Sequence, residues 1–322
     1  MSKKLSDFKN VIELNEYFQD ESRCRKYLEK ILWDDKPYCP RCQSEKVYAF
    51  PDGIRYKCAN NKCYKIFTVT VGTFLESSKI PLRKWLHAIF IFTSHKKGIS
   101  SHQLAKDLGI TQKSAWFVLS RIRDILKEKA PHMLKGTVEI DETYVGGKVS
   151  NKHASQRKNI KNKMSPLIKT PVLGLVERDG AVRLRVIRNV DRVTVLPIVR
   201  QNIASDTRMI TDSAWMYTPL KATHEHHVVN HADGEYVRDG FVHTNSIENF
   251  WSHLKRGVTG IYHQVSPKHL HRYCDEFAFR YNTRKQTEVQ RFDIAIKQAF
   301  GRLKYDDLIG KNIQPKVDIT KS

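Results

Sequence analysis

The sequence predicts an α/β core with a mixed sheet, preceded by a small cysteine-rich ribbon and an all-α segment. Three observations lead to this prediction. Four cysteines lie within residues 37–73, apolar residues recur at helical spacing over 80–130, and strand patterns alternate with helical ones over 136–300. Residues 1–36 are expected to form a helical lead-in, and 301–322 a polar tail.

Length and composition narrow the class of protein further. The chain has 322 residues, with 56 Lys and Arg against 34 Asp and Glu, so its formal charge is +22. Apolar residues at 40% and aromatic residues at 10% exclude a disordered or fibrous protein. So large a positive charge favours a polyanionic partner, and nucleic acid is the first candidate.

The apolar runs of the sequence are too short for a membrane protein. The longest, residues 85–92, contains a histidine and is far below the roughly 20 residues of a membrane span. The N-terminus is basic but lacks the apolar segment of a signal peptide. We therefore expect a cytoplasmic protein without a membrane partner, in which cysteines bind metal and do not form disulfides.

Four of the six cysteines are spaced as ligands of one Zn²⁺ ion. They form two close pairs, Cys39 with Cys42 and Cys58 with Cys63. Residues 47–50 and 54–57, between the pairs, read as two strands joined by a turn, so a hairpin separates the two metal-binding loops. Zn²⁺ prefers this tetrahedral set of thiolates, and the spacing favours it over four unrelated buried cysteines. The metal is expected to supply folding energy to a ribbon that is too small to fold alone.

Residues 80–130 have the pattern of a helix-turn-helix. After a helix over 81–94, a short helix begins near Ser100 and ends at Gly109, and a basic helix then runs from Gln112 to about Leu126. In a helix-turn-helix this last helix enters the major groove. The polar side chains that we expect it to expose are Gln112, Lys113, Arg121 and Arg123, and the first three of these are expected to bind DNA. A structural three-helix bundle is the alternative.

From residue 137 the pattern changes to strands alternating with helices. Three strands are predicted first, then a helix, a fourth strand, a fifth strand and a second helix. This is the element order of a ribonuclease H-like α/β core. The predicted ranges are 137–145, 172–178 and 181–187 for the first strands, 193–203 for the helix, 208–212 and 226–230 for the last strands, and 245–256 for the second helix.

Three carboxylates fall where this order would bring them together. Asp141 lies within the first strand, Asp212 ends the fourth strand, and Glu248 lies on the second helix. Phosphoryl transfer by two Mg²⁺ ions about 3.5–4 Å apart needs such a cluster of oxygen ligands. Lys255 follows Glu248 by two helical turns and so shares its side of the helix, where it suits a DNA phosphate.

Each of these residues also has a simpler, structural explanation. Asp212 would cap the following turn, Glu248 would form a capping box with Asn245, and Lys255 would complement the helix C-terminus. The catalytic interpretation therefore depends on the four residues occurring together. The sequence contains neither GxGxxG nor GxxxxGK[ST], so nothing in it predicts a bound dinucleotide or ATP.

With these motifs assembled, the sequence resembles bacterial insertion-sequence transposases in which a zinc ribbon and a helical DNA-binding segment precede a DDE (acidic-triad) core. The resemblance extends from about Trp33 to Arg284. Its most specific parts are residues 38–42, 72–74 with 81–85, 138–147, 211–213, 243–257 and 265–282.

The resemblance implies a DNA transposase that binds the ends of its element and catalyses metal-dependent strand cleavage and strand transfer. It implies Asp141, Asp212 and Glu248 as the triad that binds Mg²⁺ or Mn²⁺, with Lys255 as the trailing basic residue. The implied partners are double-stranded DNA, both element ends and target, and further copies of the chain assembled on DNA. A bacterial cytoplasmic location at the nucleoid follows from this interpretation.

Two positions differ from the family pattern or leave a choice. Cys58 and Cys63 lie two residues further apart than the usual second pair, a spacing that tetrahedral ligation tolerates. Some relatives carry Asn at the third acidic position, which makes Asn245 an alternative to Glu248. We prefer Glu248 because a carboxylate is the better Mg²⁺ ligand.

A basic segment follows the first acidic strand directly. Residues 148–169 contain seven Lys and Arg and no acid. We expect a loop that follows DNA phosphates through Lys158, Lys161 and Lys163, with a merely solvated loop as the alternative. Five histidines over 224–243 lack metal-site spacing, so we expect structural or phosphate-facing roles for them.

Two other functions fit the same residues. One is a zinc-ribbon and helix-turn-helix regulator that only binds DNA, and the other is a structure-specific nuclease built on the same core. Inverted repeats that flank the gene would favour the transposase.

Overall fold

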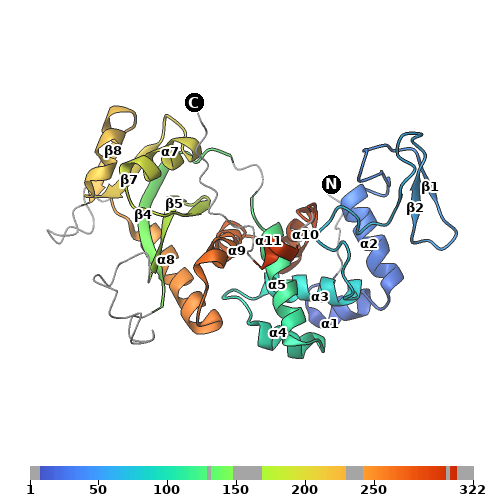
Figure 1. Cartoon of the computed structure of the whole chain (residues 1–322). Helices are drawn as coiled ribbons and strands as arrows, with labels where there is room; N and C mark the ends of the chain where they lie inside the picture. The colour runs from blue at the N-terminus through green and yellow to red at the C-terminus, as the bar shows by residue number, and fades with distance from the viewer. Residues whose placement is uncertain (1–7, 129–131, 148–168, 230–241, 302–304, 310–322) are drawn as a thin grey trace. The chain divides into compact units, whose positions relative to one another are not determined.

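The chain folds into two compact units (Figure 1). One unit comprises Met1–Leu126 together with Lys285–Ser322, and the other comprises Lys127–Arg284. No helix among the residues described is long and apolar enough to cross a membrane. This computed structural model describes residues 8–128, 132–147, 169–229, 242–301 and 305–309.

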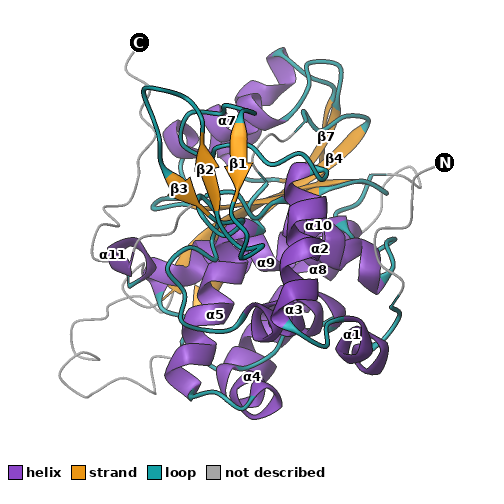
Figure 2. Cartoon of the chain, turned by 90° about the vertical axis from the view of Figure 1, so that its right-hand side faces the viewer, coloured by secondary structure: helices purple, strands orange, loops and turns teal. Residues whose placement is uncertain are grey.

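The ribbon in the first unit is a three-stranded antiparallel sheet in the order β1-β2-β3 (Figure 2). β1 (Val47–Ala49) and β2 (Tyr56–Cys58) form the predicted hairpin. Its turn depends on Asp52, whose carboxylate accepts the N–H groups of Ile54 and Arg55. The third strand, β3 (Ile66–Phe67), has two residues, too few to show a periodicity in the sequence.

The helical part of this unit begins and ends at the predicted signals. Ser100 caps α4 (Ser101–Leu108), Gly109 ends it in the left-handed conformation, and Thr111 caps α5 (Gln112–Ile125). The other helices upstream are α1 (Val11–Tyr17), α2 (Glu21–Trp33) and α3 (Leu82–Ser94). The lead-in is therefore two capped helices, and α4 and α5 are joined by a tight turn.

The C-terminal part of the chain corrects our domain boundary. We predicted one core domain up to residue 300, but the second unit ends at Arg284. The reason is α10 (Glu288–Lys297), which packs with α2 and α3: its buried Phe292 contacts Tyr27 of α2 and Phe90 of α3. The predicted polar tail also contains a short helix, α11 (Tyr305–Leu308), and Leu308 is buried.

The second unit is built on a five-stranded mixed sheet in the order β6-β5-β4-β7-β8. β4 pairs antiparallel with β5, and β5 with β6, whereas β4–β7 and β7–β8 are parallel pairs. All five predicted strands are present, and β7 has the bounds that we predicted. The strands are β4 (Thr137–Gly146), β5 (Lys169–Glu177), β6 (Val182–Val186), β7 (Arg208–Asp212) and β8 (His226–Val229).

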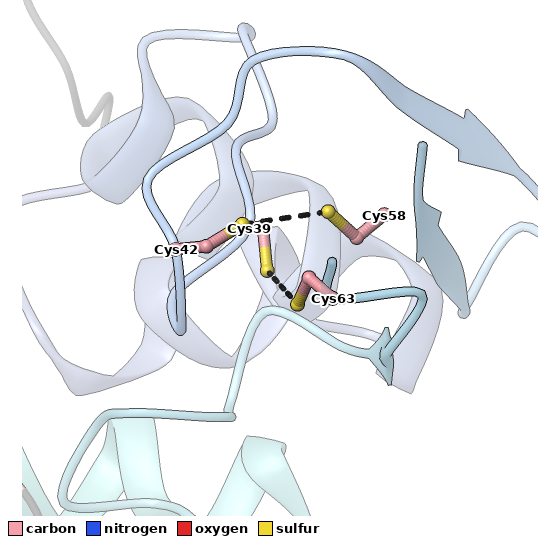
Figure 3. A group of neighbouring side chains, drawn as sticks. All are labelled: Cys39, Cys42, Cys58 and Cys63. Atoms are coloured by element: carbon pink, nitrogen blue, oxygen red, sulfur yellow. Dashed lines mark hydrogen bonds between the residues drawn. The ribbon is translucent and has the colours of Figure 1, made fainter. Parts of the chain in front are cut away.

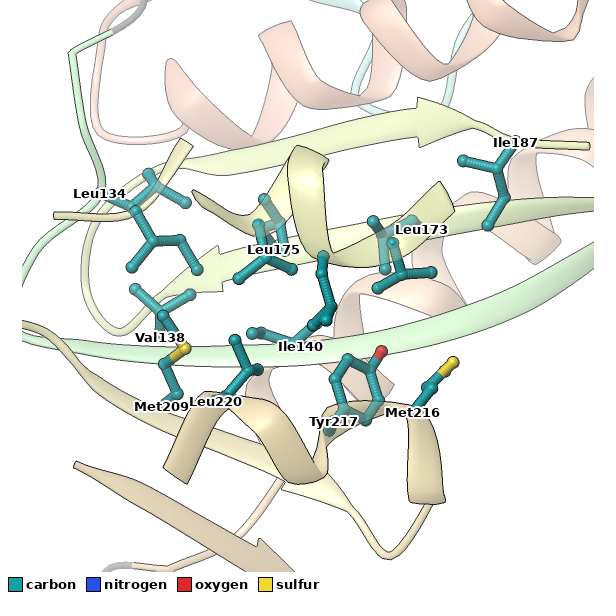
Figure 4. Packing of buried hydrophobic residues seen from close by; sticks show 14 residues of the cluster. Leu134, Val138, Ile140, Leu173, Leu175, Ile187, Met209, Met216, Tyr217 and Leu220 are labelled. Atoms are coloured by element: carbon teal, nitrogen blue, oxygen red, sulfur yellow. The ribbon is translucent and has the colours of Figure 1, made fainter. Parts of the chain in front are cut away.

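Successive side chains of β4 point to opposite faces of the sheet, and both faces are buried. On one face Val138 and Ile140 pack with Leu173 and Leu175 beneath α7 (Arg192–Asn202) and the 3₁₀ helix η2 (Trp215–Ala222) (Figure 4). The opposite face is covered by α8 (Asn245–Gly257) and α9 (Leu270–Asn282). We call this opposite face, which includes Asp141, the acidic face.

Candidate functional site

The four predicted zinc ligands converge in the ribbon (Figure 3). Their ligand atoms all lie within 4.8 Å of one another, with Sγ–Sγ distances of 3.8 Å between Cys39 and Cys63 and 3.5 Å between Cys42 and Cys58. Tetrahedral Zn²⁺ with Zn–S bonds of about 2.3 Å requires S–S distances of about 3.8 Å. The four thiols therefore fit a zinc ion, and the longer Cys58–Cys63 loop does not prevent this geometry.

Strand register brings the first two acidic residues to neighbouring positions. β4 and β7 run parallel, and their last registered pair is Glu139 with Ile210. Asp141 and Asp212 each lie two residues beyond that pair, so both belong to the acidic face. The Asp212 carboxylate also accepts the N–H of Ala214 at 3.0 Å, which is the capping role that we considered as an alternative.

Helix α8 carries the third acid over the same face. Its buried side chains, among them Ile247 and Trp251, pack against the sheet, whereas Glu248 and Lys255 are exposed. Glu248 accepts a hydrogen bond from the Thr244 hydroxyl at 3.2 Å. The capping box with Asn245, which we considered as an alternative role for Glu248, is not present, because Thr244 and not Asn245 is the N-cap of α8.

The pKa of Asp141 is affected by the other two acids, Asp212 and Glu248. Burial raises its pKa, and the negative charges of Asp212 and Glu248 raise it further. The hydrogen bond from Trp251 acts in the opposite direction. Among the described residues only the cysteines form a set with all ligand atoms within 4.8 Å, so the three carboxylates are neighbours in a looser arrangement.

Trp251 fixes the Asp141 side chain. The indole Nε1 of Trp251 donates to the Asp141 carboxylate at 2.8 Å. The ring reaches this position by lying across Gly174, which is the residue opposite Asp141 on β5. A Cβ at Gly174 would lie 2.5 Å from two ring carbons of Trp251, so only glycine leaves room for the indole.

A buried carboxylate two residues before Asp141 caps α8. Glu139 is fully buried, and one of its oxygens accepts the Ile247 N–H at 2.9 Å. Its other oxygen accepts the Arg178 Nε–H at 2.8 Å, and Arg178 also donates to the His243 carbonyl at 2.8 Å. Thr244 makes no side-chain cap bond to the helix backbone, so Glu139 supplies the cap from the sheet. This contact joins the strand of Asp141 to the helix of Glu248.

Glu142 lies on the other face of β4, away from the three acids. Its carboxylate accepts a hydrogen bond from the Tyr217 hydroxyl. Burial raises its pKa to about 8, and the charges of Asp141 and Asp212 add to the shift. This environment suits a neutral structural carboxyl better than a metal ligand.

The helix predicted to read DNA is present as α5, but two of the four side chains that we expected to be exposed on it are buried. Gln112 and Lys113 are exposed at the start of α5. Arg121, which we expected to be exposed, is only 7% exposed: its guanidinium lies over Phe117 and donates to the carbonyls of Phe74 and Glu76. Arg123, which we also expected to be exposed, is only 2% exposed, and its guanidinium lies over the ring of Phe92. Helical periodicity therefore overestimated the exposed face of α5.

The structure describes some of the predicted lysines and histidines and not others. Lys158, Lys161 and Lys163 lie outside the described part of the chain, as does His231. The other four histidines make contacts consistent with structural roles. His224 contacts Thr223, His226 contacts Thr211, His227 contacts Glu225 and His243 contacts Arg178.

Sequence reasoning missed Glu139, Arg178, Trp251 and Gly174. Two of the four could have been noticed in the sequence. Glu139 lies on the same face of its predicted strand as Asp141, and Trp251 follows Glu248 by three residues. Their roles depend on contacts between segments up to 110 positions apart, which local patterns do not encode.

Comparison with known proteins gives matches in both units. Residues 133–282 match the family described as the ISXO2-like transposase domain, and residues 19–65 match the transposase zinc-ribbon domain. An uncharacterized protein in transposable element ISH50 of Halobacterium salinarum is 29% identical in an alignment of 279 residues that covers 82% of this chain and 91% of the relative. An uncharacterized transposase-like protein of Haemophilus influenzae is 30% identical over 98 residues, which are 30% of this chain and 77% of the relative.

Proposed function

Because the chain belongs to the family of insertion-sequence transposases that join a transposase zinc ribbon to an ISXO2-like transposase domain, we propose that it binds the ends of its element and catalyses strand cleavage and strand transfer there. Water attacks the phosphodiester at the element end and releases a 3′-hydroxyl. That hydroxyl then attacks a phosphodiester of the target DNA, so one phosphodiester replaces another and no nucleotide cofactor is consumed.

The observation that carries this proposal is the convergence of Asp141, Asp212 and Glu248 on the acidic face. Two come from adjacent parallel strands and the third from the helix packed on them, and their charges interact. The strand order, three antiparallel strands followed by two parallel ones, supports a ribonuclease H-like core. We assign this core to residues 127–284.

The three carboxylates suit a pair of Mg²⁺ or Mn²⁺ ions, which bind hard oxygen ligands. Such ions would lower the pKa of bound water and stabilise charge on the leaving oxygen. The protein's own contribution is placement: Trp251 orients the Asp141 carboxylate, and Glu139 holds the start of α8. Lys255, exposed two turns after Glu248, binds a DNA phosphate beside the acids. The contact of Glu142 with Tyr217 favours Glu248 over Glu142 as the third ligand.

Recognition of the element ends is assigned to the first unit. We interpret α4 and α5 as a helix-turn-helix in which Gln112 and Lys113 face the base edges. Gln112 donates to the Ser101 hydroxyl at 2.8 Å, which fixes its position between the two helices. The protein assembles as a homo-oligomer on the DNA.

The test is cleavage and joining of a labelled element end by purified protein with Mg²⁺ or Mn²⁺. Alanine at Asp141, Asp212 or Glu248 should abolish both reactions, while binding of the end in a gel shift is retained or strengthened, because negative charge facing DNA is removed. Robust joining by Glu248→Ala would move the third ligand to Asn245. Full activity in EDTA would contradict the metal mechanism, and cleavage without any joining would identify a nuclease.

A further inference from the structure

The two faces of the ribbon sheet have opposite environments. On the inner face, the ring of Trp33 from α2 meets those of Tyr56 and Phe67 at centroid distances of 5.4 Å and 6.0 Å. Phe67 is buried, and the Tyr56 hydroxyl donates to Glu29 of α2 at 3.1 Å. The inner face is therefore occupied by α2.

The outer face is exposed although it carries large side chains. Tyr48, Lys57 and Ile66 are directly opposite one another on the three strands, so they form one row across the sheet. Tyr48 is 67% exposed and Ile66 is 53% exposed. Tyr64, 56% exposed, extends the row, because the Lys57 Nζ lies 5.9 Å from the centroid of its ring. We call these four residues the outer face of the ribbon.

We propose that the outer face binds the sugar-phosphate backbone of duplex DNA. Residues 37–73 contain six Lys and Arg against two Asp and Glu, so the ribbon attracts a polyanion. Lys57, at the centre of the row, neutralises a phosphate, and the hydroxyls of Tyr48 and Tyr64 donate to phosphate oxygens. Ile66 contacts deoxyribose. None of these groups distinguishes one base pair from another in such a contact, so the binding is independent of sequence.

The composition of the row favours DNA over a protein partner. A lysine at the centre of a buried protein interface loses its hydration and needs an acidic partner in exchange. In the ribbon, Lys57 has the aromatic ring of Tyr64 beside it in place of an acid. Lysine is correspondingly depleted from the cores of protein interfaces. Against a phosphate backbone the same lysine gains a charged partner and displaces counterions.

This inference rests on the proposed DNA-binding function, and its test separates the two. Zinc-loaded, full-length protein is titrated with a duplex of unrelated sequence over a range of salt concentrations. Lys57→Gln should weaken binding about five- to tenfold at 0.1 M salt and reduce the slope of log K against log salt by about 0.9. Tyr48→Ala should weaken binding without changing the slope, because a neutral side chain displaces no counterion.

The matched control is Lys30→Gln, which removes one exposed charge from α2, the helix on the inner side of the sheet. It should leave affinity and slope unchanged. Equal losses for Lys57→Gln and Lys30→Gln would overturn the proposal, since net charge alone would then explain both. An Ile66→Ser variant that loses self-association but keeps full DNA binding would overturn it in favour of a protein interface. Wild-type protein that bound no duplex would contradict the proposed function first, and this inference with it.

Discussion

The zinc ribbon and the five-stranded sheet hold their reactive side chains in different ways. The ribbon strands have three, three and two residues, and of its four cysteines Cys58 ends β2 while the other three lie in turns and loops. In the five-stranded sheet, β4 and β5 have ten and nine residues. The pairing of these two strands positions Asp141 without any bound ligand. A zinc ion at the four cysteines would therefore contribute to folding of the first unit, whereas a metal at the acids would contribute only to the chemistry of the second.

The largest expected effect is loss of the zinc site. Cys42→Ser removes one of the four thiolate ligands, so the ribbon should unfold locally and release zinc, because metal binding and folding are coupled there. DNA binding should fall sharply, while the amides of the five-stranded sheet keep their protection in hydrogen exchange. Elemental analysis should find one zinc per wild-type chain and less in the variant.

Cys24→Ser is the matched control, because Cys24 is buried in α2 outside the metal site. It should keep its zinc. A Cys42→Ser protein that retains zinc and binds DNA normally, or loss of sheet protection in the same variant, would break the distinction between the two units.

The next effect concerns the contact between β4 and α8. Glu139→Gln preserves shape and an acceptor for the Ile247 N–H but removes the charge that faces Arg178. We expect the start of α8 to be destabilised by about 1–3 kcal/mol, because a charged group loses its partner in a buried site. Faster hydrogen exchange at the first turn of α8 would measure this, together with weaker Mn²⁺ binding at the acids.

Glu225→Gln offers a matched control on the same sheet. Glu225 accepts from the Arg208 Nε–H at 2.6 Å, but this pair is on the surface, so its removal should change exchange at α8 very little. If both variants loosened α8 equally, the cap supplied by Glu139 would not be what places Glu248.

Local signals in the sequence predicted most elements and the groups that carry chemistry. Thiol pairs, caps and strand patterns depend on neighbours within a few positions, so the ribbon ligands, the turn at Gly109 and the end of β7 at Asp212 were all predictable. The roles assigned to Asp141, Asp212 and Glu248 remain predictions, supported by their proximity.

The rest depends on partners far away in the chain. Arg121 follows a polar helical stripe, yet carbonyls of residues 74 and 76 and the ring of Phe117 enclose it. Residues 288–297 form helix α10, and only their contacts with α3, some 200 positions earlier, show to which unit they belong. Such contacts are set by the folded topology, and no periodic pattern in the sequence indicates them.

A smaller effect is expected from crowding the indole on the acidic face. Gly174→Ala places a methyl group 2.5 Å from the ring of Trp251, so the ring must shift and its hydrogen bond to Asp141 lengthens. Overpacking of this kind costs about 1–3 kcal/mol of the free energy of unfolding. Strand transfer should fall with it, while DNA binding by the first unit is unchanged. Gly147→Ala, where nothing lies within 4 Å of the added Cβ, should be silent in both assays.

The smallest effect should come from Lys255→Ala. This variant tests whether the second unit positions a DNA-binding side chain as well as the three acids. Lys255 is exposed on α8 and is proposed to bind a phosphate, so its loss should weaken DNA engagement about five- to tenfold at 0.1 M salt. Joining at saturating DNA should stay near the wild-type rate, because no metal ligand is removed. Arg256→Ala is the control on the same helix, since that guanidinium donates to the Ser252 hydroxyl at 2.6 Å. If Lys255→Ala abolished joining at saturating DNA, Lys255 would belong to the reacting centre; if Arg256→Ala had the same effect on binding, the contribution would be general charge.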